Sequence, residues 1–388
     1  MPEPLLYLKA MGAAAIVSAI IVLAMVLARR HASTTWLNFS CILGIGLGIV
    51  VGYGVVSLRL VWPPVNGLDR FLTITVPLAL SIELIAGFPN VPRWVAWLLR
   101  MSLAVTIPRI LLHGSAYLSD SPEGWTPWQA GMSLAVCGAL LAGVWSLLSR
   151  LSQRSPGTSI PLALCLPILC AGLTVMMAGY IKGGVAAFPL LATLVATTVA
   201  ARLMSKRSVA LNNFRAPAIV GIGVVGLFGL LFVGRFFGRL STDYALAMLL
   251  SPLLCWVTEI TQLRHWKPWL LGTLRLVLVA IPLLVVLAAA KRDFDRKMAP
   301  LLGNTQASPQ SNSLMDSRSS TNAIGRPLWS GRVAAGSMPK TSRYNVASRF
   351  CGMYELPSGC SARDVVAPMT WPILKPPPAT RAKLDCGQ

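Results

Sequence analysis

Long apolar runs separated by short polar connections fill the first 290 residues of the chain. A run of about 20 apolar residues is long enough to cross the hydrocarbon core of a bilayer as one α-helix. Because the connections are short, consecutive helices should run antiparallel in one bundle. The sequence therefore predicts an all-α polytopic membrane protein with about ten transmembrane helices, at residues 5–28, 37–58, 71–88, 92–113, 128–149, 160–181, 184–204, 216–236, 243–261 and 268–290.

The character of the sequence changes near the last of these runs. Beyond Ala299 the chain is rich in Ser, Asn, Gln, Pro and Gly, and it keeps neither a helical nor a strand period. Such segments bury too little apolar surface to fold alone. We therefore expect a transmembrane domain over 1–290 and a basic, Ser/Pro-rich disordered tail over 291–388. An alternative interpretation is an arm that contacts anionic headgroups or a partner protein.

The composition supports a membrane protein. Hydrophobic residues make up 55% of the 388 residues and charged residues only 12%, with a mean hydropathy of +0.65. We expect an integral protein of a bacterial cytoplasmic membrane, with the lipid bilayer as its main partner and oligomerisation left open. The net charge of +21 would suggest nucleic-acid binding in a soluble protein. Here the basic residues lie between apolar runs and in the tail, where topology and anionic lipid account for them, so no nucleic-acid partner is expected.

Basic residues near the helix ends indicate an orientation, because cytoplasmic connections carry an excess of Lys and Arg. With the N-terminus outside, the cytoplasmic side would hold Arg29, Arg30, Arg93, Arg150, Arg154, Arg202, Lys206, Arg207, Arg215, Arg264 and Lys267. The other side would hold the smaller set Lys9, Arg59, Arg70, Lys182, Arg235 and Arg239. This orientation is therefore favoured, although the cluster Lys291, Arg292, Arg296 and Lys297 opposes it.

Landmarks that recur at an offset of about 175 residues indicate an internal repeat. In order, the paired landmarks are Asn38 and Asn213, Gly44 and Gly221, Asp69 and Asp243, Pro77 and Pro252, Glu83 and Glu259, Trp97 and Trp269, and Arg100 and Arg275. We expect a four-helix unit over about 1–113, a connecting helix pair over about 114–183, and a second unit over about 184–290. An even number of helices separates the copies, so the repeat is predicted to be parallel.

The glycine-rich runs of the two copies have one explanation in common. GIGVVG, from Gly221 to Gly226, matches the dinucleotide pattern G-x-G-x-x-G, but it lies inside an apolar run rather than between a strand and a helix. Small residues let helices approach closely in lipid, so we predict helix packing instead. The packing glycines are predicted to be Gly44, Gly48, Gly52, Gly221, Gly223 and Gly226. We expect the two glycine-rich helices to form the centre of the bundle, with contact between them as one arrangement.

Residues able to carry out chemistry are few. The three histidines and eight cysteines have no metal-ligand spacing, and no triad order or nucleophile elbow is found. We therefore predict no catalytic residue, no metal, no cofactor and no enzyme activity. Asp69 and Asp243 are expected to cap helices.

Four charged residues inside predicted helices are the candidate site: Glu83, Arg100, Glu259 and Arg275. In each copy the glutamate lies about 7 Å and the arginine about 12 Å from the same membrane face, at about 1.5 Å per residue. A lone charge at this depth costs about 2.5–3.5 kcal/mol, so an intramembrane ion pair near the cytoplasmic side is predicted in each copy. In a transporter, one pair is expected to open and bind a charged substrate or a proton. The alternatives are a fixed structural pair and plain snorkelling to the interface.

These features favour a transporter-like permease for a small solute or ion. The reasons are the duplicated architecture, helices interrupted by Pro and Gly, and charges placed symmetrically within them. The alternative is a non-transporting membrane scaffold or assembly protein in which the same charges are structural. A membrane-embedded transferase ranks third, because no large loop with acidic metal ligands is present.

Overall fold

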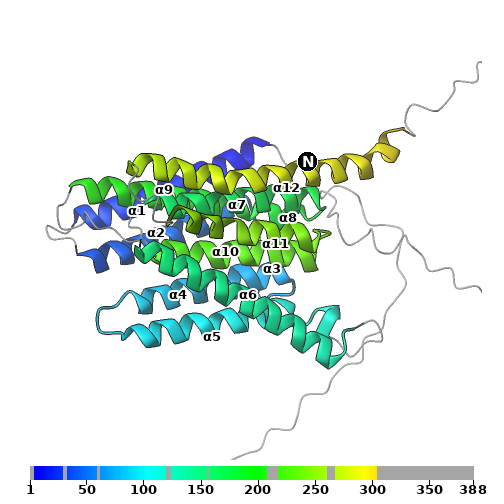
Figure 1. The fold of residues 1–388 in the computed structure, drawn as a ribbon, viewed down its shortest axis with the longest axis horizontal. Helices are drawn as coiled ribbons and strands as arrows, with labels where there is room; N and C mark the ends of the chain where they lie inside the picture. The colour runs from blue at the N-terminus through cyan, green and yellow to red at the C-terminus, as the bar shows by residue number, and fades with distance from the viewer. Residues whose placement is uncertain are drawn as a thin grey trace, which may run out of the picture. The chain divides into compact units, whose positions relative to one another are not determined.

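The computed structural model describes residues 4–28, 33–58, 62–118, 124–154, 157–207, 217–259 and 267–303. Every regular element within these residues is helical, and eight helices there are long and apolar enough to cross a membrane. The chain is thus an all-α, multi-pass membrane protein (Figure 1). The number of ten crossings and the internal repeat stay predictions. The disordered tail also stays a prediction, because most of it lies outside the described residues.

The elements that carry these eight apolar segments agree with the predicted positions to within a few residues, except that α6 and α12 continue farther at their C-terminal ends. They are α1 (Pro4–Leu27), α2 (Thr34–Val55), α5 (Arg93–Leu112), α6 (Pro127–Arg154), α7 (Ser159–Met177), α8 with α9 (Ile181–Val185 and Ala187–Arg207), α10 (Pro217–Phe236) and α12 (Pro268–Gly303).

The two remaining predicted crossings, 71–88 and 243–261, are helical but interrupted. The first consists of α3 (Gly67–Arg70), a π-helical segment η1 (Phe71–Thr75) and α4 (Val76–Ala86). The second consists of α11 (Thr242–Leu250) and a 3-10 segment η4 (Ser251–Glu259). Each change of helix type adjoins a proline, Pro77 or Pro252, which lacks an N–H group and disturbs the preceding turn.

The centre of the bundle is α10. It is buried from Ala218 to Gly234. Of its apolar membrane-spanning stretch, 94% is buried inside the bundle, against 28% for α1 and 22% for α12. It contacts α6 on one side and α7 on the other, and these in turn contact α5 and α12. In Figure 1, α5 and α12 accordingly lie at opposite edges of the bundle, with α10 between them. The outer helices are left to face lipid.

Glycines allow the close approaches in this bundle, and each of the two glycine-rich helices packs mainly on other helices. In α2, Cβ atoms added at Gly44, Gly48 and Gly52 would meet α1 and α9. A Cβ atom at Gly48 would lie 2.9 Å from the carbonyl oxygen of Ala14. The small residues Ala14 and Ser18 of α1 let these backbones approach. Contact between α2 and α10 is slight by comparison.

The glycines of α10 receive large side chains from other helices. A Cβ atom at Gly223 would overlap Leu164 of α7, and one at Gly226 would be 2.5 Å from a methyl group of Leu190 in α9. Farther along, Gly229 leaves room for the ring of Phe71, the first residue of the π-helical segment. GIGVVG is thus a packing surface within a continuous α-helix, not a strand-to-helix turn.

The last helix is longer than the sequence indicated. The predicted crossing ends at 290 and the tail begins at 291, whereas α12 continues to Gly303. Charges of opposite sign recur three and four residues apart in this part, as at Asp293, Arg296 and Lys297, and such pairs stabilise an exposed helix. The Tyr244 hydroxyl of α11 also donates to Asp293, at 2.8 Å.

Candidate functional site

The first ion pair joins the end of α4 to the next helix, α5. Arg100 donates from Nε to Oε1 of Glu83 at 2.9 Å and from a terminal nitrogen to Oε2 at 2.6 Å. The Glu83 side chain is 1% exposed and that of Arg100 15%. Two parallel charge-assisted bonds fix both side chains in one plane. The contact expected from the sequence is therefore present, and the acid is its buried member.

The glutamate fits against α10 because residue 221 there is glycine. A Cβ atom at Gly221 would overlap the Glu83 carboxylate and would lie 3.2 Å from the indole Nε1 of Trp145 in α6. Trp145 is 1% exposed, and its Nε1 has no hydrogen-bond partner among the described residues. The carboxylate thus lies where α4, α5, α6 and α10 meet.

The second ion pair joins the end of η4 to α12. Arg275 donates to Glu259 at 2.8 Å, to the Thr258 hydroxyl at 2.7 Å, and to the Ser159 hydroxyl of α7 at 2.9 Å. Here the arginine side chain is 8% exposed and the glutamate side chain 23%. The contact matches the sequence prediction again, but the base is the buried member. Sequence reasoning did not identify the two hydroxyl partners.

Each ion pair adjoins a cavity lined by arginines. The first cavity, of about 470 Å³, contains Arg93, Arg100 and Arg150 in its wall. The second, of about 600 Å³, has Arg154, Arg202 and Arg275. Within the described part of the chain, the ion pairs found are those of Arg100 and Arg275, so the other four arginines have no acidic partner there. The sequence had indicated these four only as markers of topology.

Both cavities lie at one end of the bundle. The first is lined by the end of α4, the first turns of α5 and the last turns of α6. The second also contains the end of α6, together with the starts of α7 and α12 and the last turns of α9. This is the end predicted to face the cytoplasm.

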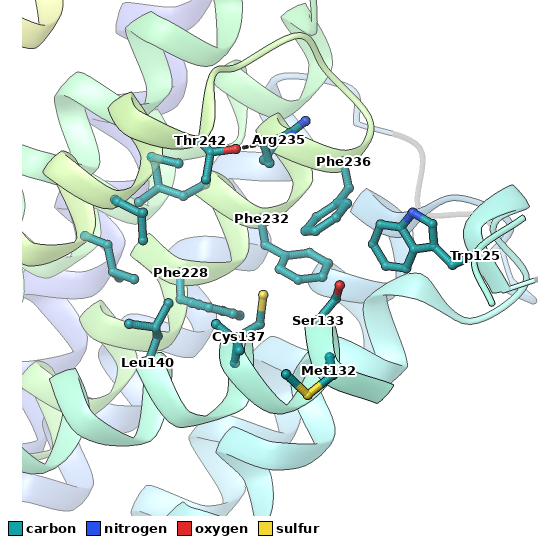
Figure 2. A pocket seen from close by; sticks show the side chains of 15 residues that line it. Trp125, Met132, Ser133, Cys137, Leu140, Phe228, Phe232, Arg235, Phe236 and Thr242 are labelled. Atoms are coloured by element: carbon teal, nitrogen blue, oxygen red, sulfur yellow. Dashed lines mark hydrogen bonds between the residues drawn. The ribbon is translucent and has the colours of Figure 1, made fainter. Parts of the chain in front are cut away.

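A third cavity, of about 430 Å³, lies toward the other end of α6 (Figure 2). It is bordered by Phe228, Phe232 and Phe236 of α10 and by apolar residues of α6 and α11. Its charged lining residue, Arg235, donates to the Thr242 hydroxyl at 2.7 Å. Because its remaining surface is almost wholly apolar, this recess suits hydrocarbon and offers no acid–base group.

The chemistry available to the site is limited to charge and hydrogen bonding. Among the described residues, no group of three or more His, Cys, Asp or Glu side chains could hold a metal ion. The described cysteines, Cys41, Cys137, Cys165, Cys170 and Cys255, are free thiols within the apolar bundle. The ion pairs and their arginine-lined cavities are therefore the features that can recognise a charged species.

Comparison of the sequence with models of known protein families and with curated proteins found no match.

Proposed function

We propose that this membrane protein is a transporter-like permease for a small solute or ion. The observation that carries the proposal is that the glutamate of each buried ion pair belongs to an interrupted helix. A π-helical segment precedes Glu83, and Glu259 ends a 3-10 segment. Discontinuous helices form substrate and ion sites in many transporters, and ionisable residues at membrane depth commonly mark their pathways.

In the transport step, a proton or a charged solute would replace one member of an ion pair as the partner of the other. Arg100 lines the first cavity and is therefore reachable by a charged species, while Glu83 lies behind it. A proton taken up by Glu83, or a negative group bound by Arg100, removes the charge balance that keeps the pair closed. The π-helical segment Phe71–Thr75, about two helical turns before Glu83, gives this helix an irregular turn.

The alternative function, a non-transporting scaffold or assembly protein, has an observation of its own in support. Both carboxylate oxygens of Glu83 are bonded to Arg100, and Arg275 has a partner at each of its three nitrogens. The charges of pairs bonded in this way are balanced without a ligand, as expected of fixed structural links between helices.

Electrical recording from proteoliposomes on a solid-supported membrane can separate the two functions. The probes are concentration jumps of protons, sodium, chloride and inorganic phosphate. A permease should give a transient current with at least one probe, and Glu83→Gln with Arg100→Gln should abolish it. Gly143→Ala, at a position open to its surroundings, is the matched control and should keep the current.

An accessibility measurement covers solutes outside that set. In a transporter the pair opens, so Ala79→Cys, which is buried in α4 one turn from Glu83 and keeps the pair intact, should react with a water-soluble methanethiosulfonate reagent. Ala104→Cys, equally buried in α5, should stay unreactive. Folded protein that gives no current, and in which the cysteine of Ala79→Cys is as unreactive as that of Ala104→Cys, would establish the scaffold instead.

A further inference from the structure

The second arginine-lined cavity has the chemistry of a phosphate site. Arg154 and Arg202 have no acidic partner among the described residues, and Arg275 has one. Three guanidinium groups therefore line the cavity, and among the described residues a carboxylate, that of Glu259, is bonded to Arg275. The start of α7 adds to this field, because the helix-capping residue Thr158 makes no side-chain cap bond and lines the same cavity. The N–H groups of Ser159 and Ile160 in the first turn favour an anion, whereas Pro161 has no N–H group.

The same cavity lies beside an apolar groove. This groove, of about 880 Å³, is lined by α1, α7, α9 and α12. Leu162 and Leu276 belong to the walls of both, so the two spaces lie next to each other along α7 and α12. On α1 the floor includes Gly12, which has no neighbouring atom within 4 Å of an added Cβ.

The dimensions agree with one lipid leaflet. Along α9 the groove extends from Leu191 to Leu203, about 18 Å at 1.5 Å per residue. This length is similar to half the thickness of a bilayer's hydrocarbon core, which is about 30 Å in total. Trp269, which is 65% exposed, lies beside the arginines, as aromatic residues do at the membrane interface.

We infer that this composite site binds an anionic phospholipid. The phosphate group lies among Arg154, Arg202 and Arg275 at the start of α7, and an acyl chain occupies the groove. A neutral apolar ligand would leave the arginines unused, and a free anion would leave the groove unused. The inference does not depend on whether the protein transports a solute.

The first cavity provides the internal control. It also has three arginines beside an ion pair, but none of its lining residues lines the apolar groove. Removal of Arg93 and Arg150 changes the net charge by the same amount, at the same end of α6, as removal of Arg154 and Arg202. Arg275 is left unchanged in the test because its loss would break the second ion pair.

The experiment measures lipid binding to the purified full chain by native mass spectrometry in detergent. Phosphatidylglycerol and phosphatidylcholine of the same chain length are titrated separately, and inorganic phosphate is titrated alone. We expect tighter binding of phosphatidylglycerol. Arg154→Gln with Arg202→Gln should weaken it about thirtyfold, from the usual contribution of two basic residues near an anionic headgroup. Arg93→Gln with Arg150→Gln should change it less than threefold on the same scale.

A second variant tests the groove without changing any charge. Ala196→Trp places a large ring in the groove wall of α9 and should also weaken phosphatidylglycerol binding. Equal binding of the two lipids, or equal losses in the two arginine variants, would overturn the site. Inorganic phosphate binding that depends on Arg154 and Arg202, without lipid preference and without an effect of Ala196→Trp, would overturn the lipid assignment. Thermal unfolding in detergent verifies that each variant is folded.

Discussion

The two ion pairs are built from the same residue types but bury opposite partners. At the end of α4 the glutamate is 1% exposed and the arginine reaches outward. At the end of η4 the glutamate is 23% exposed and the arginine is enclosed. The first pair closes on itself through two parallel bonds, whereas Arg275 divides its bonds among a carboxylate and two hydroxyls.

Neighbouring helices, not the pair itself, decide which charge is buried. At the first pair Gly221 of α10 leaves space for a carboxylate and supplies no side-chain partner. At the second pair Thr258 and Ser159 supply oxygen acceptors for an arginine. A buried charge needs its bonding capacity filled, so the two surroundings select different members. Arg100 should therefore depend entirely on Glu83, whereas Arg275 should depend on Glu259 only in part.

The largest effect is expected from Glu83→Gln. This change leaves Arg100 without its counter-charge at membrane depth, which should lower the free energy of unfolding by about 3 kcal/mol. Adding Arg100→Gln removes the uncompensated charge and should restore part of that loss. Reversible unfolding in mixed detergent micelles measures both. A double variant less stable than Glu83→Gln alone would contradict the pairing energetics.

The next effect tests the space beside the carboxylate. Gly221→Ala places a methyl group where Glu83 lies, and overpacking of this kind costs about 1–3 kcal/mol. Gly143→Ala in α6, with no neighbouring atom within 4 Å, is the matched control and should be neutral or slightly stabilising. The same unfolding measurement applies, and similar losses in both variants would show that the fit at Gly221 is unimportant.

Glu259→Gln should be milder than Glu83→Gln. Arg275 keeps the hydroxyl groups of Thr258 and Ser159, and the amide oxygen can still accept one bond, so about 1 kcal/mol should be lost. The ratio of the two losses, measured in the same micelles, is the direct test of the comparison. If Glu259→Gln proved the more damaging, the proposed role of the hydroxyl groups would have to be abandoned.

The smallest effect is expected from Ser159→Ala. A single hydrogen bond between membrane helices contributes about 0.6 kcal/mol on average, and Arg275 retains two other partners. The loss should rise when Ser159→Ala is combined with Glu259→Gln, because the arginine then depends on Thr258. Ser102→Ala, exposed on α5, serves as the control. Strict additivity in the double-mutant cycle would indicate that the partners do not share the arginine.

The contacts within each pair could be predicted because an acid and an arginine on either side of a short turn lie at similar membrane depth. Their surroundings could not, since Ser159 and Arg275 are 116 positions apart and meet only through helix packing. The packing of α2 on α1 agrees with their short connection, whereas the slight contact of α2 with α10 depends on how helices far apart in the chain pack. The prolines at 77 and 252 were evident, but whether a turn widens to π or tightens to 3-10 depends on the side chains packed around it.

The enclosed position of α10 has a consequence for how the protein is made. Its neighbours α4, α6, α7 and α9 all leave the ribosome before residues 217–236 do. Until then the space at their centre must hold lipid or be closed by non-native contacts between these helices. The late arrival of one apolar, glycine-rich segment therefore completes the assembly of helices that entered the membrane long before it. A chain truncated before residue 217 should remain inserted yet lack its native packing.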